Sequence, residues 1–586
     1  MDKPRFLHMY TVVAAAVVLA LYAVPITYLV VFHVGLLDAL RGVLSEIASS
    51  SPTPEFRIVE VRRGYGVVLV AFRGLDLGIV ANSVALALFV SCTATLLGLF
   101  TALVSYLYRL PKLLVYAPIA ASIPVPFVKA VAVYKLLDPS IGLVNVLLQR
   151  LGIGLRFSVE GLAAVALYQV MVFYPVVHLM VFGYLSSLPR EFLEAAYMVG
   201  AGVRRASLGV LLPLARPAAV AGMAMAFILS LDDLEAPLVF EKYPAARNLL
   251  VYRAYRYFLD EVSGRYIPSG VGYAAILLAL SIAVFAVSYK YIAVVYRSFG
   301  AAILGGGRRY RLRIAGARDA VVVAFMVVAI LTALVPTAVA VVYAFSNRWV
   351  GELLPELGPG ALQEFLGDPS RVRAVLNSAV YSLAALGLAL ALSLPASYYT
   401  ARRAPLSKLL DAVFTIPMVV PGIVVAYSYI ALFKYMPGPL NIFSVPQLYL
   451  VVAYAIRRIT YVYKALQVAV TAIPRDLEEA SYVVGARDRD TLIRVVAPLA
   501  VGASTPLIVF ASIHLVTEVS TSITIGALGP TMGWGSTAPV SYVVFRDITI
   551  SSLLYVGAAV IEVFLSIAVT LVALLAVLKL ANIRWG

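Results

Sequence analysis

The sequence predicts an all-α, polytopic membrane protein with about twelve transmembrane helices in two parallel six-helix repeats. The chain has 586 residues, is 62% hydrophobic and only 13% charged. Its apolar runs are longer than soluble core elements need, and several motifs recur between its two halves. Because a hydrocarbon core about 30 Å thick requires ~20 apolar residues per helix, we expect the bilayer to surround most of this chain.

Twelve apolar stretches account for the predicted helices. In the first half they lie at 6–34, 79–107, 113–136, 159–185, 216–240 and 270–297. In the second half they lie at 319–345, 375–401, 409–434, 448–472, 501–526 and 551–580. The first stretch is too long for the hydrophobic region of a cleaved signal peptide, so we expect it to be a membrane helix. The chain thus divides into a first half at 1–297, a linker at 298–318 and a second half at 319–586.

The basic residues predict topology and argue against nucleic-acid binding. The formal net charge is +16, but the positive residues lie mostly in short loops between apolar stretches. The linker contains no acidic residue and carries Arg308, Arg309, Arg311 and Arg313. We therefore expect the linker and both chain ends to be cytoplasmic, in a multi-pass protein of the cell (plasma or inner) membrane. The segment 241–269, rich in tyrosine and arginine, weakens this rule locally and is a candidate docking surface.

The single cysteine limits the chemistry of the chain. Cys92 excludes an intramolecular disulfide, and a thiol-ligated metal site is not expected. Because it lies inside an apolar run, we expect Cys92 to be a small buried hydrophobe.

An internal repeat organises the chain. The segment around Asn82 matches the segment around Asn377, and SIPVPFV at Pro124 matches TIPMVVPG at Pro417. A third pair is LPREFLEAAYMVGA from Leu188 and IPRDLEEASYVVGA from Ile473. Because both halves have the same predicted topology, a pseudo-two-fold axis along the membrane normal is expected to relate them.

The third pair predicts a short amphipathic helix in each half. Phe192, Ala195 and Val199 share one helical face, and Gly200 stands where that helix would end. The second half repeats the pattern with Leu477, Ala480, Val484 and Gly485. Such a helix outside the membrane must bury its apolar face, and a groove on a partner protein would cover it.

These segments resemble the coupling-loop motif of binding-protein-dependent ABC importer permeases. The matching positions are Glu194-Ala195-Ala196, Gly200 and Pro213, then Glu479-Ala480-Ser481, Gly485 and Pro498. The second copy departs from the family pattern at Ser481 and at Ala497. The resemblance implies that both helices dock into a partner ATPase, with the glutamates making polar contacts, the alanines allowing close approach and the glycines allowing a turn.

The resemblance also implies the partners and the mechanism. We find no G-x-x-x-x-G-K-[ST] phosphate-binding loop, so the chain is expected to be no enzyme and to use a homodimer of a cytoplasmic ABC ATPase. ATP and Mg would bind that ATPase, with no cofactor or metal bound by this chain, and an external binding protein would deliver the solute. ATP binding and hydrolysis would then drive alternating access.

Charged residues inside the apolar stretches are candidates for the solute pathway. Asp233 and Glu518 occupy equivalent repeat positions and would form an acidic pair at the external mouth, or acids near Asp233 would simply cap a helix end. Arg457 and Arg458 lie in mid-helix, followed by Tyr461 and Lys464, and either line a hydrated path or pair with acids of the second half.

Other polar residues and prolines inside the stretches have alternative interpretations. Lys129, Gln169 and His514 are expected to be satisfied interhelical hydrogen-bond partners. Prolines at 124, 126, 175, 417 and 421 bend or break helices, either around a transport pathway or for packing alone.

The fused two-half form resembles the branch of importers that includes ferric iron, thiamine and 2-aminoethylphosphonate permeases. The stretches LGDPSRVRAVLNSAVYSLA and YAIRRITYVYKALQVAVTAIPRDLEEA are most similar to ferric-iron members. The outer acids Asp233 and Glu518 favour ferric iron, a thiamine-like solute or another small cation over an anion. The alternative is a secondary transporter with two six-helix halves driven by an ion gradient. That class usually has a basic, glycine-containing signature between helices two and three, where this chain has only RLPK at 109–112.

Overall fold

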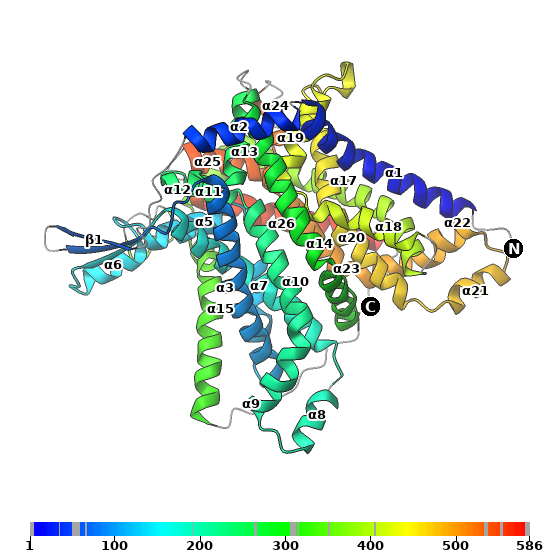
Figure 1. The fold of residues 1–586 in the computed structure, drawn as a ribbon, viewed down its shortest axis with the longest axis horizontal. Helices are drawn as coiled ribbons and strands as arrows, with labels where there is room; N and C mark the ends of the chain where they lie inside the picture. The colour runs from blue at the N-terminus through cyan, green and yellow to red at the C-terminus, as the bar shows by residue number, and fades with distance from the viewer. Residues whose placement is uncertain are drawn as a thin grey trace.

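A computed structural model describes most of the chain (Figure 1). The described residues are 5–33, 35–49, 59–64, 67–189, 191–262, 267–304, 312, 316–347, 349, 352–402, 406–531, 537–550 and 555–580. The predicted Arg308, Arg309, Arg311 and Arg313 of the linker lie outside them.

The molecule is predominantly helical, as predicted, and its helices are long and apolar. Within the described residues, nine helices could cross a membrane by length and composition, or ten if one bent pair is a single span. The predicted count of twelve is therefore not confirmed. The difference arises because 113–136 is split into the short helices α4 (Lys112–Ser122) and α5 (Val128–Leu137), and because α20 (Pro446–Ala472) carries three basic residues in mid-helix.

The two halves repeat each other element by element. Each outer element of the first half has a counterpart in the second half. The pairs are α1 (Arg5–Thr27) with α15 (Ala317–Ala344), α2 (Leu36–Ser49) with α16 (Gly360–Gly367), α13 (Leu250–Val262) with α25 (Val540–Ile550), and α14 (Pro268–Leu304) with α26 (Val556–Leu580). Each inner element of the first half also has a counterpart in the second half. In chain order the pairs are α3 (Ile79–Leu107) with α17 (Pro369–Ala401), α4 with α18 (Ser407–Thr415), α5 with α19 (Gly422–Phe433) and α7 (Gly161–Ser186) with α20. They continue with α8 (Glu191–Met198) and α21 (Asp476–Val483), α9 (Val203–Ala206) and α22 (Asp488–Asp490), α10 (Leu212–Asp232) and α23 (Ala497–Val516), and α11 (Glu235–Val239) and α24 (Ser520–Thr531). The parallel repeat predicted from three motifs thus extends over both halves.

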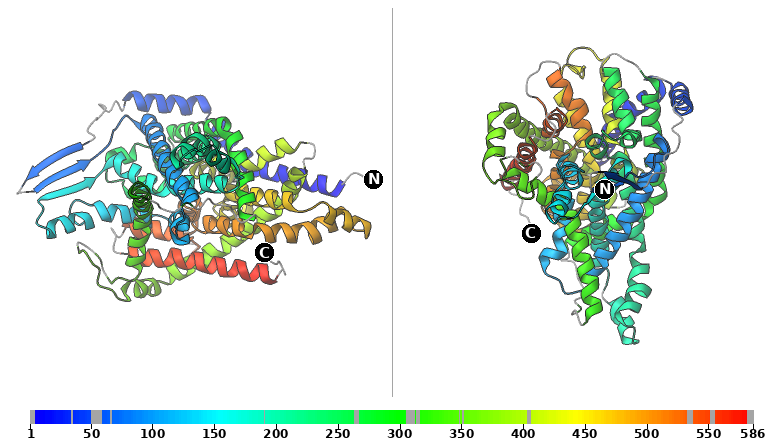
Figure 2. Two further views of the ribbon diagram at one scale, coloured as in Figure 1. Left: turned by 90° about the horizontal axis from the view of Figure 1, so that it is seen from below. Right: turned by 90° about the vertical axis from the view of Figure 1, so that its left-hand side faces the viewer.

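The first helix of each half packs against the other half. In Figures 1 and 2, α1 lies along helices of the second half, where Tyr10 donates to the carbonyl of Ala391 over 2.9 Å and Tyr429 donates to that of Leu21 over 2.6 Å. In the same way α15 packs on α3, α4 and α5, and Tyr108 donates to Asp319 over 2.9 Å. The two halves are therefore interlocked rather than simply abutted.

A small sheet projects from the first half, at the left of Figure 1. Strand β1 (Val59–Gly64) pairs antiparallel with β2 (Val67–Phe72), which pairs parallel with β3 (Leu155–Val159), beside α6 (Leu143–Arg150). The predicted all-α class describes the bulk of the molecule but missed this sheet. Its strands are short and one comes from a distant loop, so no local run of residues revealed the pairing.

The prediction that Cys92 is buried is wrong. Cys92 is exposed on α3, on the same face as the exposed Leu88, Phe89 and Leu96. In a helix that crosses a membrane, an apolar residue is equally stable against lipid or protein. An apolar run therefore did not show which of its residues are buried in the protein.

Candidate functional site

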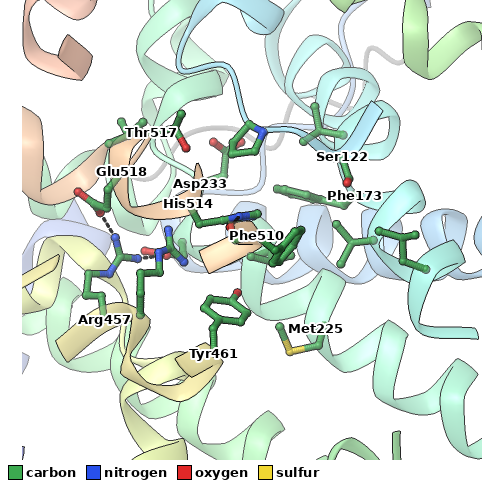
Figure 3. A pocket seen from close by; sticks show the side chains of 18 of the residues that line it. Ser122, Phe173, Met225, Asp233, Arg457, Tyr461, Phe510, His514, Thr517 and Glu518 are labelled. Atoms are coloured by element: carbon green, nitrogen blue, oxygen red, sulfur yellow. Dashed lines mark hydrogen bonds and ion pairs between the residues drawn. The ribbon is translucent and has the colours of Figure 1, made fainter. Parts of the chain in front are cut away.

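A central cavity lies between the two halves (Figure 3). It has a volume of about 500 Å³ and is lined by α7 and the α4–α5 and α10–α11 breaks of the first half, and by α20 and the α23–α24 break of the second. All four predicted pathway residues line it: Asp233, Glu518, Arg457 and Arg458. Apolar side chains form most of the remaining wall, as is usual for a small-molecule site with a few polar groups.

Proline-broken helices shape the cavity. The chain leaves helical geometry between α4 and α5, around Pro124 and Pro126. In the equivalent place of the second half, the segments Ser407–Val419 and Gly422–Phe433 meet at 97°. Lys129 satisfies carbonyls freed by the first break, donating to Ala121 over 2.7 Å and to Ile123 over 2.5 Å. By contrast, Pro175 lies within the continuous helix α7, so only the paired prolines break helices.

Arg457 joins the two halves at the cavity wall. Its guanidinium binds Asp232 of α10 over 2.6 Å and also pairs with Glu518, which is fully buried. Asp232 in turn accepts from the backbone N–H of Gly422 over 2.7 Å. Arg457 thus pairs with an acid of the second half, as one of its two alternatives proposed, and with an acid of the first half, while a hydrated path stays a prediction.

Asp233 and Glu518 both line the cavity, and each carboxylate has its own hydrogen-bond donors. Asp233 accepts from Gln169 over 2.9 Å and from the first N–H of α11 over 3.0 Å. Glu518 accepts from the N–H groups of Thr521 and Ser522, over 3.0 and 3.2 Å, at the start of α24. The alternative, that acids here cap a helix end, is the one observed, in both repeats.

Sequence reasoning gave Glu235 no role beyond capping. Its carboxylate accepts from the backbone N–H of Phe127 over 3.0 Å and from the Tyr168 hydroxyl over 3.1 Å. Glu235 therefore ties α11 to the break between α4 and α5. The signal for this was its place among three acids just before Pro237, within an otherwise apolar stretch.

The remaining polar groups of the cavity wall come from α20 and α23. Lys464 pairs with Asp411 over 2.6 Å, whereas Arg458 lies over the Tyr461 ring at 5.9 Å. His514 has its Nδ1 3.0 Å from the Phe510 carbonyl, and its ring packs beside Tyr461. As predicted, Gln169 and Lys129 are hydrogen-bonded to groups outside their own helices, whereas the contact of His514 is to a carbonyl within its own helix α23 and is not interhelical.

Two short helices project from the ends of the two halves, α8 at the bottom and α21 at the right of Figure 1. Gly200 and Gly485 follow these helices with φ of 78° and 87°. The N–H of Ala201 bonds to the carbonyl of Ala196, and that of Ala486 to Ser481, both over 3.0 Å. Each helix therefore ends in a left-handed glycine turn, as the sequence predicted.

The apolar residues at the ends of both helices have no cover. Met198 and Val199 are 87% and 84% exposed, and the equivalent Val483 and Val484 are 87% and 83% exposed. Glu194, Ala195, Gly200, Glu479, Ala480 and Gly485 are exposed, Ala196 is half-buried and Ser481 is buried. Pro213 and Pro498 begin the next long helices α10 and α23. The structure thus presents two equivalent surfaces, while the role of each residue in coupling stays a prediction.

The two projecting helices are anchored differently. Leu193 of α8 is buried among apolar side chains, whereas its counterpart Glu478 of α21 is buried in an ion pair with Arg402 and accepts from Tyr398 over 2.5 Å. Ser481 contributes a further hydrogen bond to Thr491 over 2.7 Å. Its departure from the motif therefore has a structural use.

Two repeated helical halves around one central cavity are typical of a membrane transport permease, and comparison with known proteins gives the family. The family model of the binding-protein-dependent transport system inner membrane component matches residues 94–298 and 385–581. These segments cover more than half of the chain, one in each half. The chain therefore belongs to this family, in its fused two-half form, and the family is one of transport permeases rather than ATPases.

Two curated relatives are similar over a shorter part. One is the "Putative ferric transport system permease protein FbpB 1" of Haemophilus influenzae, 27% identical over 218 residues, which are 36% of this chain and 33% of the relative. The other is the ferric transport system permease protein FbpB of Actinobacillus pleuropneumoniae, 26% identical over 230 residues, or 39% of this chain and 32% of the relative. The alignments thus span about a third of each relative.

Proposed function

We propose that this chain is the membrane-spanning subunit of an ATP-driven importer, whose two projecting helices receive work from a separate ATPase. The observation that carries the proposal is the pair α8 and α21, which share the same terminal turn and the same uncovered apolar residues. A short helix with an exposed apolar face is stable in water only when a partner covers that face. Two equivalent faces fit two equivalent ATPase subunits.

The proposed complex contains a homodimer of a cytoplasmic ABC ATPase, which binds ATP and Mg, and an external binding protein. In this arrangement both chain ends and the linker are cytoplasmic. The start of α1 packs against α22, next to α21, which supports placing the first chain end on the ATPase side. The proposed location is the cell membrane, plasma or inner.

Alternating access is the proposed mechanism. ATP closes the ATPase dimer, the two coupling helices move toward each other and the halves rock around the central cavity. ATP drives this change only through its different affinity for the two conformations. In the described structure the halves are held together near α13 and α19 and diverge toward α8 and α21 (Figure 1), an arrangement expected of a cavity closed to the outside.

The proposed cargo is a small solute delivered by the binding protein, with ferric iron as the first candidate. The support is the similarity to the two relatives, which are named as ferric transport system permease proteins. A cavity of about 500 Å³ suits a small solute or chelate.

The test of the coupling role is uptake by the reconstituted complex in which Glu194 and Glu479 are both changed to alanine. We expect transport to fall at least about tenfold, with ATP binding to the ATPase retained, because each lost charge-assisted contact costs about 1.5–3 kcal/mol. The matched control is the double change of Asp38 and Glu356 to alanine, two exposed carboxylates elsewhere on the chain, which should leave uptake unchanged. Undiminished uptake by the Glu194/Glu479 variant would remove the assigned role.

A further inference from the structure

The carboxylates of the central cavity are already engaged. Both oxygens of Asp232 are bound, one by Arg457 and one by the N–H of Gly422. Both oxygens of Asp233 and of Glu518 are likewise bound by side-chain and backbone donors. The fourth acid, Glu235, has one oxygen bound by Phe127 and Tyr168. These acids therefore hold the protein together and offer few acceptor sites to a passing cation.

The described residues also contain no group of three or more His, Cys, Asp or Glu side chains arranged to hold a metal ion. A bare ferric ion would need several oxygen or nitrogen ligands from the wall at once. The described part of the cavity does not bring such ligands together.

Arg458 is the contrasting group. It lies on the cavity wall, and its buried Nε has no hydrogen-bond partner among the described residues. The other basic residues of α20 on the cavity wall are already paired, since Arg457 binds two acids and Lys464 binds Asp411. Arg458 therefore presents a planar set of N–H donors that no acceptor in the described part of the chain uses.

The surroundings of Arg458 hold its guanidinium in place. The Tyr461 ring lies 5.9 Å from it, and Phe510 and His514 pack against Tyr461 at 6.2 and 5.9 Å between ring centres. A cation–π contact with the Tyr461 ring attracts the guanidinium without using its N–H donors. A guanidinium with free donors in a largely apolar cavity favours a planar or tetrahedral oxyanion, which it binds through two parallel hydrogen bonds.

We propose that Arg458 binds an oxyanion group of the transported solute in the central cavity. The solute is thus a carboxylate or phosphate compound, or a ferric ion that crosses with its oxyanion ligands still attached, rather than a bare metal ion. This inference rests on the proposed transport function and names the chemical class of its cargo. Both forms of cargo share the oxyanion that Arg458 recognises.

The binding test uses the purified full chain in lipid nanodiscs, without the ATPase. Citrate, inorganic phosphate and ferric citrate are titrated by calorimetry, and hexaamminecobalt(III) serves as a trivalent cation without an oxyanion. We expect at least one of the three oxyanion probes to bind, and Arg458→Gln to weaken that binding about tenfold or more, because a charge-assisted bidentate contact is lost. Arg458→Lys, which keeps the charge but loses the fork, should weaken it less.

The matched control is Arg216→Gln, an exposed arginine of α10 that does not line the cavity and should leave binding unchanged. If iron-free citrate binds as tightly as ferric citrate, the cargo is a free oxyanion. If ferric citrate binds and iron-free citrate does not, the cargo is the chelate. Either result supports the proposal. Binding of hexaamminecobalt(III) but of none of the oxyanion probes, or equal oxyanion binding by Arg458→Gln and wild type, would overturn it.

A second measurement avoids any variant that fails to fold. In the wild-type chain, the oxyanion that binds should slow phenylglyoxal modification of Arg458, followed by peptide mass spectrometry, and leave modification of Arg216 unchanged. Equal modification with and without oxyanion would contradict the proposal. The binding measurement needs no ATPase, so it is independent of uptake by the reconstituted complex. Oxyanion binding without ATP-driven uptake would reject the importer function alone. ATP-driven uptake without oxyanion binding would reject this inference alone.

Discussion

At the scale of single residues, the cavity depends on a glycine that lets two halves meet. Gly422 follows the break before α19 and its N–H binds Asp232, while Arg457 binds the other oxygen of the same carboxylate. A Cβ at position 422 would lie 2.6 Å from the Cβ of Ser520 and would also collide with the Arg457 guanidinium. Only glycine therefore allows this meeting of α10, α19, α20 and α24.

We predict that Gly422→Ala destabilises the chain by about 1–3 kcal/mol, because the added methyl group overpacks a filled site and displaces a buried ion pair. Thermal unfolding of the purified chain in detergent measures the change. The control is Gly387→Ala in α17, where a Cβ would meet nothing within 4 Å and alanine should be neutral or slightly stabilising. Equal unfolding temperatures for the two variants would show that the site tolerates a side chain.

The residues of the cavity could be named from the sequence, but their pairing could not. Intramembrane charge is costly, which is why Arg457, Arg458, Asp233 and Glu518 stood out, and all four line the cavity. The partners of Arg457, Asp233 and Glu518 include side chains of other helices and backbone amides at helix breaks. No one-dimensional pattern records such contacts.

At the scale of elements, the two projecting helices α8 and α21 are defined by how they end. Gly200 and Gly485 have positive φ and open space where a Cβ would stand, so a substitution there meets backbone strain and no steric clash. The sequence was sufficient to predict this, because a glycine directly after a short amphipathic helix is a local signal. The small sheet of β1, β2 and β3 lacked such a signal.

We predict that Gly200→Ala and Gly485→Ala, combined, weaken binding of the ATPase about fivefold or more. A left-handed conformation costs a residue with a Cβ roughly 1–2 kcal/mol, and the helix end that carries the exposed apolar residues would fray. Affinity between the purified chain and its ATPase checks this, for example by titration of labelled ATPase.

The control for this element is Gly202→Ala. Gly202 is two residues beyond Gly200, has a φ of −69° and also has open space around it, so alanine should be tolerated. Asparagine at positions 200 and 485 should weaken binding less than alanine, since it adopts the left-handed conformation more readily. If alanine at 200 and 485 were as benign as at 202, the turn would not matter to docking.

At the scale of the whole molecule, the halves are interlocked by α1 and α15 and fastened by a cluster around Glu261 of α13. Glu261 binds Lys434 and His33, both over 2.9 Å, and accepts from Tyr427. Lys434 and Tyr427 belong to the second half, so this cluster bridges the halves on the face that carries α2 and α13. Desolvation raises the pKa of Glu261, but hydrogen bonds from His33, Tyr427 and Lys434 outweigh it and lower that pKa to about 2.

We predict that this fastening is strong near neutral pH and disappears in acid. Because the folded-state pKa of Glu261 lies below the ordinary value of 4.5, its contribution to stability is complete above about pH 4.5 and is lost as the pH falls toward 2. Glu261→Gln should therefore lower the unfolding temperature at pH 7, and the difference from wild type should shrink across that acid range. Asp38→Asn, which removes an exposed carboxylate paired with the exposed Arg41 over 3.4 Å, should change little at either pH.

In the reconstituted complex the same Glu261→Gln change should raise ATP hydrolysis in the absence of the binding protein, because it removes a contact that favours the outward-closed form. A variant whose stability difference persisted at pH 2, or whose basal ATP hydrolysis matched wild type, would show that Glu261 does not hold the two halves together.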